Sequence, residues 1–225
     1  MWCVAEINDE YKEKMEDVLA IYEKKYDSKE PVVCIDERPL VLRADVRETV
    51  TSRPGKIARR DGEYKRNGTA NAFCAVEPKA GRHFTKITKN RKAWQFARMV
   101  EEIVRSYPRV RTIHLVMDNL STHKKKSLIE HFGNRRGKKL WARISPHYTP
   151  KHGSWLNQAE IEISMFSRQC LGKDRIGTLA AMKRRAHAWN KRMNKDQVKI
   201  NWTFTRQKAR DKFKYKKLNF RLAKH

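Results

Sequence analysis

The sequence predicts an α/β fold in which a mixed sheet is covered on both faces by helices. The unbroken apolar run Val32–Ile35 and the largely apolar segment Ile113–Met117 are typical of strands that are buried on both faces. Segments with the three- and four-residue spacing of amphipathic helices lie before, between and after the strands. The predicted order of strand, two strands, helix, strand, helix, strand and helix, followed by a helical tail, fits a sheet between two helical layers.

The first predicted element is a helix from about residue 9 to residue 25. Its apolar stripe is formed by Met15, Val18, Leu19 and Tyr22, and its acidic outer face is expected to be an ordinary solvated surface. The first apolar strand comes after Pro31 and is expected to end at Asp36.

A basic loop and two further strands are predicted next. Residues 51–68 mix Pro, Gly and cations with little apolar periodicity, which is typical of a mobile loop, and a loop of this length is usually functional. Residues 70–76 and 83–88 are predicted strands joined by a turn at 78–81. Helical spacing then begins at Trp94 and ends before Pro108.

The second half of the chain begins with the apolar strand Ile113–Met117, which is followed by another acid, Asp118. A helix at about 124–132, a short strand near 141–145 and a loop at 146–154 are predicted next. A helix opens around residues 155–157, and two basic helices at 178–194 and 205–218 form the tail.

Composition restricts the class of protein. The 52 Lys and Arg residues against 25 Asp and Glu give a formal net charge of +27, which indicates a polyanionic partner. An apolar content of 39% excludes an intrinsically disordered chain, and no apolar run approaches the roughly 18 residues of a membrane span. The chain also begins without the pattern of a signal peptide, so we expect a soluble protein inside the cell. Its four cysteines have no paired CxxC spacing, which predicts reduced thiols and neither a zinc knuckle nor a disulfide framework.

Three acids form the first candidate site: Asp36 and Asp118 at the ends of the two apolar strands, and Glu160 on a later helix. Carboxylates that converge repel one another unless cations lie between them. Mg²⁺ takes such oxygen ligands, and two ions roughly 3.5 to 4 Å apart can support an in-line phosphoryl displacement. On local pattern alone, Asp118 is explained equally well as a strand end that caps the following helix.

The neighbours of these acids leave alternatives open. Asn119, His123 and Asn157 are candidates for ordering the site, and simple turn and helix-start chemistry explains Asn119 and His123 as well. At roughly 100° per residue, Glu160 and Glu162 flank the apolar stripe of their helix at similar angles, so the helix does not choose between them.

Five segments of the sequence resemble the catalytic region of bacterial IS630-family transposases, relatives of the Tc1/mariner group. The resemblance covers essentially the whole chain in the order of the family. The segments are VVCIDERP (32–39), EYKRNGTANAF (63–73), HLVMDNLSTH (114–123), GSWLNQAEIEISMFSRQCL (153–171) and INWTFTRQKARDKFK (200–214).

The resemblance implies an RNase H-like fold, with a mixed five-stranded sheet flanked by helices, and a DDE triad. The triad is carried over to Asp36, Asp118 and Glu160 as the catalytic, metal-binding residues for two Mg²⁺ ions, for which Mn²⁺ can substitute. Glu162 becomes a flanking surface or salt-bridge residue. Glu37, the neighbour of Asp36 on a strand, is expected to face the opposite side and is kept as a minor alternative.

The implied function is metal-dependent cleavage of DNA followed by transfer of the 3′-hydroxyl end of an insertion sequence into target DNA, with TA as the expected target. The expected partners are transposon ends and target DNA, with a homodimer in the transposition complex and no membrane. The expected location is the bacterial cytoplasm, in association with the nucleoid. The alternatives are an RNase H-like nuclease that does not join DNA and a non-catalytic DNA-binding remnant of a transposase.

The predicted domain organisation is a linker and helix at 1–30, a DDE catalytic domain at 31–175 and a basic helical extension at 176–225. The N-terminal helix-turn-helix region of the family is expected to be missing, because residues 1–30 are acidic and predict a single helix. Residues 168–225 hold 19 Lys and Arg against three Asp, which indicates phosphate contacts. The predicted DNA-binding residues are Arg59, Arg60, Lys65, Arg66, Lys183, Arg184, Arg185, Arg206, Lys208, Arg210, Lys212 and Lys214.

Overall fold

The computed structural model describes residues 7–47, 54, 55, 57 and 61–216. Its five strands form one mixed sheet in the order β3-β2-β1-β4-β5. β1 pairs antiparallel with β2 and parallel with β4, and β4 pairs parallel with β5. The strands are β1 (Val32–Asp45), β2 (Tyr64–Glu77), β3 (Arg82–Thr88), β4 (Ile113–Met117) and β5 (Ile144–Tyr148).

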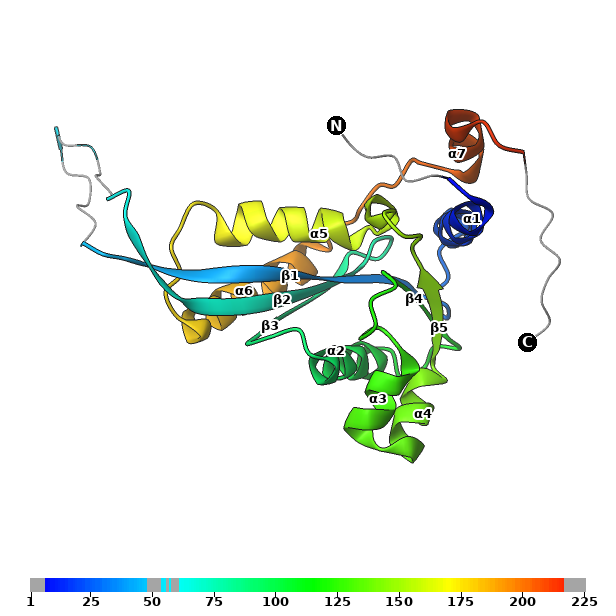
Figure 1. Cartoon of the computed structure of the whole chain (residues 1–225), viewed down its shortest axis with the longest axis horizontal. Helices are drawn as coiled ribbons and strands as arrows, with labels where there is room; N and C mark the ends of the chain where they lie inside the picture. Colours follow the sequence, from blue (N-terminus) through cyan, green and yellow to red (C-terminus); the bar gives the residue numbers. More distant parts are fainter. Residues whose placement is uncertain (1–6, 48–53, 56, 58–60, 217–225) are drawn as a thin grey trace.

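Helices cover both faces of the sheet, as the sequence predicts (Figure 1). One face carries α2 (Ala93–Ser106), α3 (Lys125–Phe132) and α4 (Asn134–Trp141). The other face carries α1 (Asp9–Glu23), α5 (Ala159–Met165) and α6 (Leu179–Asp196), with α7 (Arg206–Phe213) next to α1. None of the helices in the described residues is both long and apolar enough to cross a membrane.

Strand β1 distributes its side chains between the two cores. Val33 and Ile35 belong to the core under α2, whereas Cys34 belongs to the core under α1. Because side chains alternate along a strand, Asp36 continues the row of Cys34 and Glu37 continues the row of Ile35. The side chains of Asp36 and Glu37 therefore leave the strand on opposite faces of the sheet.

β1 is longer than the sequence predicts. The prediction ended the strand at Asp36, but the strand continues to Asp45, paired with β2 as far as Tyr64. β4 pairs only with Val32–Cys34, so the later part of β1 has β2 as its one strand neighbour in the described sheet. An edge position of this kind tolerates Pro39, which lacks a backbone N–H.

The basic loop predicted at 51–68 is correspondingly shorter. β2 begins at Tyr64, so Lys65 and Arg66 are exposed strand residues and not loop residues. Arg59 and Arg60 lie outside the described residues. The prediction of reduced cysteines is confirmed for the three described ones, which are buried free thiols (Cys34, Cys74 and Cys170).

The segment after α3 also differs from the prediction. It contains α4, which the sequence pattern did not indicate, and β5 therefore starts at Ile144 and extends to Tyr148. Gly137 explains how α4 lies so close to α3: a Cβ at this position would be 2.6 Å from the Cα of Ile129. A glycine in a polar, basic stretch weakens the helical pattern, although the contact between the two helices requires it.

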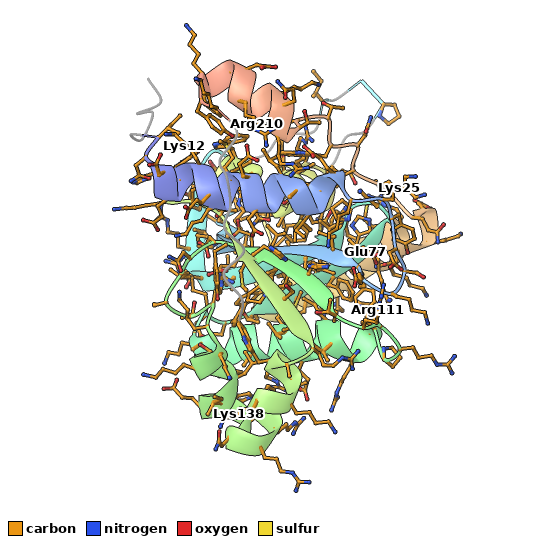
Figure 2. The ribbon with its side chains drawn as sticks, turned by 90° about the vertical axis from the view of Figure 1, so that its right-hand side faces the viewer. Lys12, Lys25, Glu77, Arg111, Lys138 and Arg210 are labelled. Atoms are coloured by element: carbon orange, nitrogen blue, oxygen red, sulfur yellow. The ribbon has the colours of Figure 1, made fainter. Side chains whose placement is uncertain are left out.

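The acidic face of α1 is not a plain solvated surface, because it holds α7. Glu16 is 2% exposed and accepts two hydrogen bonds from the guanidinium of Arg210, at 2.8 and 2.6 Å, and a third from the hydroxyl of Tyr215 at 2.9 Å. Glu23 pairs with Arg206 at 2.8 Å. Figure 2 shows Arg210 at the junction of the two helices. These two arginines, predicted as DNA contacts, thus have partners within the chain.

Candidate active site

The three predicted acids meet at one cleft. Asp36 lies on β1 just beyond the residues that pair with β4, and Asp118 directly follows β4. The two strands are parallel, so these positions fall at the same edge of the sheet. Glu160 lies in the first turn of α5, which packs on β1 and β2. All three acids line an open cleft of about 380 Å³.

Asn157 connects the helix of Glu160 to the strand of Asp36. It is 1% exposed, and its side-chain amide donates to the backbone carbonyl of Ile35 at 2.9 Å. Its side-chain oxygen accepts from the backbone N–H of Ala159 at 3.1 Å, and its backbone carbonyl accepts from the N–H of Glu160 at 3.0 Å. A single residue thus ties the start of α5 to β1, and its role in ordering the site stays a prediction.

Asp36 is in an environment that disfavours its charge. Burial raises the pKa of this carboxyl group to about 7; the hydrogen bond from the backbone N–H of Glu37 opposes the rise, and repulsion from Glu160 and Asp118 adds to it. Burial and repulsion make it unfavourable to keep Asp36 ionised, and a bound cation offsets that cost. A carboxylate cluster of this kind is therefore typical of a cation-binding site.

His123 lies between Asp118 and Glu37. The Nδ1 atom of His123 is 2.6 Å from Oδ1 of Asp118, and its Nε2 atom is 3.1 Å from Oε2 of Glu37. Burial alone would lower the pKa of His123, but the two carboxylates raise it to about 9. The pKa of Asp118 lies below its usual value. Burial raises this pKa, but the contact with His123 and the hydrogen bond from the N–H of Leu120 lower it by more. Glu37 is expected from the sequence to face the other side of the sheet, yet it also lines the cleft of the acids, and His123 links it to Asp118.

Glu162 is expected from the sequence to be a flanking surface or salt-bridge residue, and the structure supports the second alternative. It is not a flanking surface residue but is fully buried, and it pairs with His83 of β3 at 2.9 Å. The other ring nitrogen of His83 contacts the carbonyl of Val198, also at 2.9 Å. Burial raises the pKa of Glu162, and His83 counteracts the rise. Glu162 therefore anchors α5 on the side away from the cleft. Glu160 is exposed and lines the cleft.

Two arginines of the cleft were missed by the sequence reasoning. Arg38 and Arg91 line it together with the acids. Arg38 follows Asp36 by two residues on the same strand, so strand alternation could have placed it on the same face. Arg91 lies just before α2, in a polar segment with no distinguishing pattern.

A second groove of about 770 Å³ adjoins the acidic cleft, and both are lined by Asp118, Leu120 and Ser154. It runs between the start of α1 and the loop after β5, where Lys14 and Lys151 lie. Asn119 also lines it, and the Asn119 side chain accepts a hydrogen bond from Lys124 at 2.6 Å. Asn119 thus belongs to the neighbouring groove.

The remaining predicted DNA contacts divide into paired and exposed cations. Arg185 pairs with Asp174 at 2.6 Å, and Lys208 donates to the carbonyl of Thr203 at 2.8 Å. The exposed cations lie on β2, on α6 and at α7. Besides Lys208, which is also exposed, they are Lys65, Arg66, Lys183, Arg184, Lys212 and Lys214.

The donor set of the cleft suits a hard divalent cation. Its acids offer carboxylate oxygens, which Mg²⁺ and Mn²⁺ prefer, and the contacts of Asp118 with His123 and Leu120 both use Oδ1, leaving Oδ2 available. Within the described residues, no three acid, His or Cys side chains converge as a ready-made ion site. The three acids therefore suit an ion because they offer oxygen ligands and line one cleft. Their side chains would have to move closer together to bind it.

The sheet order, its mixed pairing and the acids at one edge define an α/β protein of the RNase H-like class. The chain belongs to the DDE superfamily endonuclease family, whose model matches residues 31–183. No curated protein matches the chain significantly.

Two solved structures support the fold. The mariner Mos1 paired end complex with Mg is similar with a TM-score of 0.51 and 15% identity, over 88% of this chain and 59% of that chain. The Mos1 strand transfer complex is similar with a TM-score of 0.50 and 13% identity, over 90% of this chain and 66% of that chain. The chain thus spans less than two thirds of the length of these transposase chains.

Proposed function

We propose that the chain carries the catalytic activity of an IS630-type DNA transposase, which cleaves DNA and joins a 3′-hydroxyl end to target DNA. The observation that carries the proposal is the meeting of Asp36, Asp118 and Glu160 in one cleft of a DDE superfamily endonuclease fold. The triad would hold two Mg²⁺ ions, with Mn²⁺ as a substitute. When bound, these ions supply activation of the attacking oxygen and stabilisation of the leaving oxygen.

The residues of the chain would position the DNA for this reaction. Arg38 and Arg91 face the cleft of the acids, where a guanidinium can bind a phosphate through two parallel hydrogen bonds. The adjoining groove with Lys14 and Lys151 would carry the DNA strand that leaves the cleft. Asn157 would hold Glu160 at a fixed place relative to Asp36 through its contacts with both elements.

The domain organisation stays a prediction, namely a catalytic unit at 31–175 between an N-terminal segment and a basic extension. Met182 and Trp189 of α6 share one core with Phe166, so the extension packs on the catalytic unit. A homodimer, TA as target and bacterial nucleoid association are likewise proposed on the resemblance to the IS630 family.

A joining assay tests the proposal. Double-stranded transposon-end DNA with a free 3′-hydroxyl, a supercoiled plasmid and Mg²⁺ are incubated with the full chain, and the junctions are sequenced. We expect joined product with insertions at TA. Nicked plasmid without joined product would favour an RNase H-like nuclease, and DNA binding with neither product would favour a non-catalytic remnant.

The exposed cations of α6 predict a change in the salt dependence of DNA binding. Removing Lys183 and Arg184 together (both to Ala) should lower the slope of log affinity against log salt by about 0.9 for each phosphate that these side chains neutralise in the parent chain. Binding is measured by fluorescence anisotropy between about 50 and 200 mM salt. The matched control replaces the exposed pair Lys138 and Lys139 of α4. Equal slopes for the two double variants would contradict a role of α6 in DNA binding.

A further inference from the structure

Glu37 takes part in a buried chain of polar contacts that ends at a proposed catalytic acid. The side chain of Glu37 is 4% exposed, and that of His123 is fully buried. His123 spans the gap between Glu37 and Asp118, with contacts of 3.1 Å to Glu37 and 2.6 Å to Asp118. Nε2 of His123 forms a hydrogen bond with Glu37, whereas Nδ1 is in close contact with Asp118 without a well-aligned hydrogen bond.

The surroundings of His123 fix its ring in this orientation. Phe96 of α2 lies against it, with the ring centroids 4.5 Å apart and the planes inclined by 33°. The hydroxyl of Tyr148 donates to its backbone carbonyl at 2.9 Å. The ring therefore transmits the position of Glu37, which is set by β1, to the carboxylate of Asp118.

The contacts on Asp118 distinguish its two oxygens. Oδ1 lies next to the His123 ring and accepts from the N–H of Leu120 at 3.2 Å. Oδ2 has neither of these contacts, so it is the oxygen that a cation in the cleft would engage. Partners behind a metal-binding carboxylate orient it and tune its affinity, and removal of such a partner typically weakens metal binding by about 10 to 100-fold.

We propose that Glu37 is a positioning residue for the reaction, acting through His123 to orient Asp118 so that Oδ2 faces the cleft. This inference rests on the proposed function, because it assigns Asp118 to metal binding. Asp36 and Glu37 are neighbours on β1 and both line the cleft. Glu37 acts on the site through the fully buried ring of His123.

The test compares Glu37→Ala and Glu37→Gln with the parent chain by Mn²⁺ titration, followed by electron paramagnetic resonance, and by the joining rate. We expect Glu37→Ala to weaken Mn²⁺ binding by about 10-fold or more. Glu37→Gln retains an oxygen that accepts from His123, so it should recover part of the affinity and part of the rate. The fraction of folded protein is measured by circular dichroism for each variant, and Glu37→Gln remains informative if Glu37→Ala does not fold.

Glu77→Gln is the matched control, since Glu77 is also a buried acid of the sheet, 3% exposed and hydrogen-bonded to the hydroxyl of Tyr107 at 2.6 Å. It should leave the Mn²⁺ affinity of the folded chain unchanged. Parental affinity in both Glu37 variants, together with weakened affinity in Asp118→Asn, would overturn the positioning role alone. Parental affinity and joining in Asp118→Asn would overturn the proposed function itself.

Discussion

Asp118→Asn is expected to lower the rates of DNA cleavage and joining by a factor on the order of 10³, equivalent to about 4 kcal/mol of transition-state stabilisation. The reason is that the amide removes one of the three proposed metal-binding carboxylates of the cleft, and with it a charged oxygen for a divalent cation. The rates are measured under single-turnover conditions with Mg²⁺, using a DNA end labelled at its 5′ terminus.

DNA binding should respond in the opposite direction. If the cleft receives DNA as proposed, removing a negative charge from it leaves the affinity for DNA equal or higher. Asp211→Asn provides the control, because it makes the same chemical change at an exposed position of α7, where the carboxylate accepts from Gln207. Parental cleavage by Asp118→Asn would remove Asp118 from the proposed active site.

His83→Ala is expected to lower the free energy of unfolding by about 3 to 5 kcal/mol. The variant leaves the carboxylate of Glu162 fully buried without its ion-pair partner, and Glu162 Oε2 already lacks a hydrogen-bond partner. It also removes the contact with the carbonyl of Val198, which connects β3 to the segment after α6. Urea unfolding followed by tryptophan fluorescence measures the decrease.

Two further variants show whether the buried charge is the cause. Lys86→Ala, on the same strand, breaks a partly exposed pair with Glu102 and should cost about 0 to 1 kcal/mol. Replacing His83 and Glu162 together by Leu removes both partners of the buried pair and should cost less than His83→Ala alone. A decrease below about 1 kcal/mol in His83→Ala would show that Glu162 is accommodated without its partner.

Much of the sheet could be predicted because strands that are buried on both faces consist mainly of apolar residues. The apolar runs at 32–35 and 113–117 are strands with both faces covered, and the acids that follow them meet at one edge, as the order of the strands requires. The segment around α5 also buries its apolar side chains, since Ala159 of α5, Leu156 before it and Phe166 after it are fully buried.

What could not be predicted depends on partners distant in the chain. Glu162 has the same local pattern as Glu160, and its burial becomes intelligible only with His83, which is 79 residues away. The later part of β1 combines Pro39 with charged residues, and it is a strand because β2 pairs with it. Arg206 and Arg210 look like DNA contacts by composition, yet α1 supplies a carboxylate for each.

The contacts of Asn157 determine which substitutions near the site leave its geometry intact. The separation of Asp36 and Glu160 is bridged by one amide side chain that contacts backbone atoms of both elements. Backbone atoms are common to all amino acids, so substitutions at Ile35 or Ala159 leave the partners of this amide chemically unchanged. The contacts of Asn157 thus place no demand on the side chains at positions 35 and 159, which are restricted by core packing instead, whereas position 157 itself should tolerate few replacements.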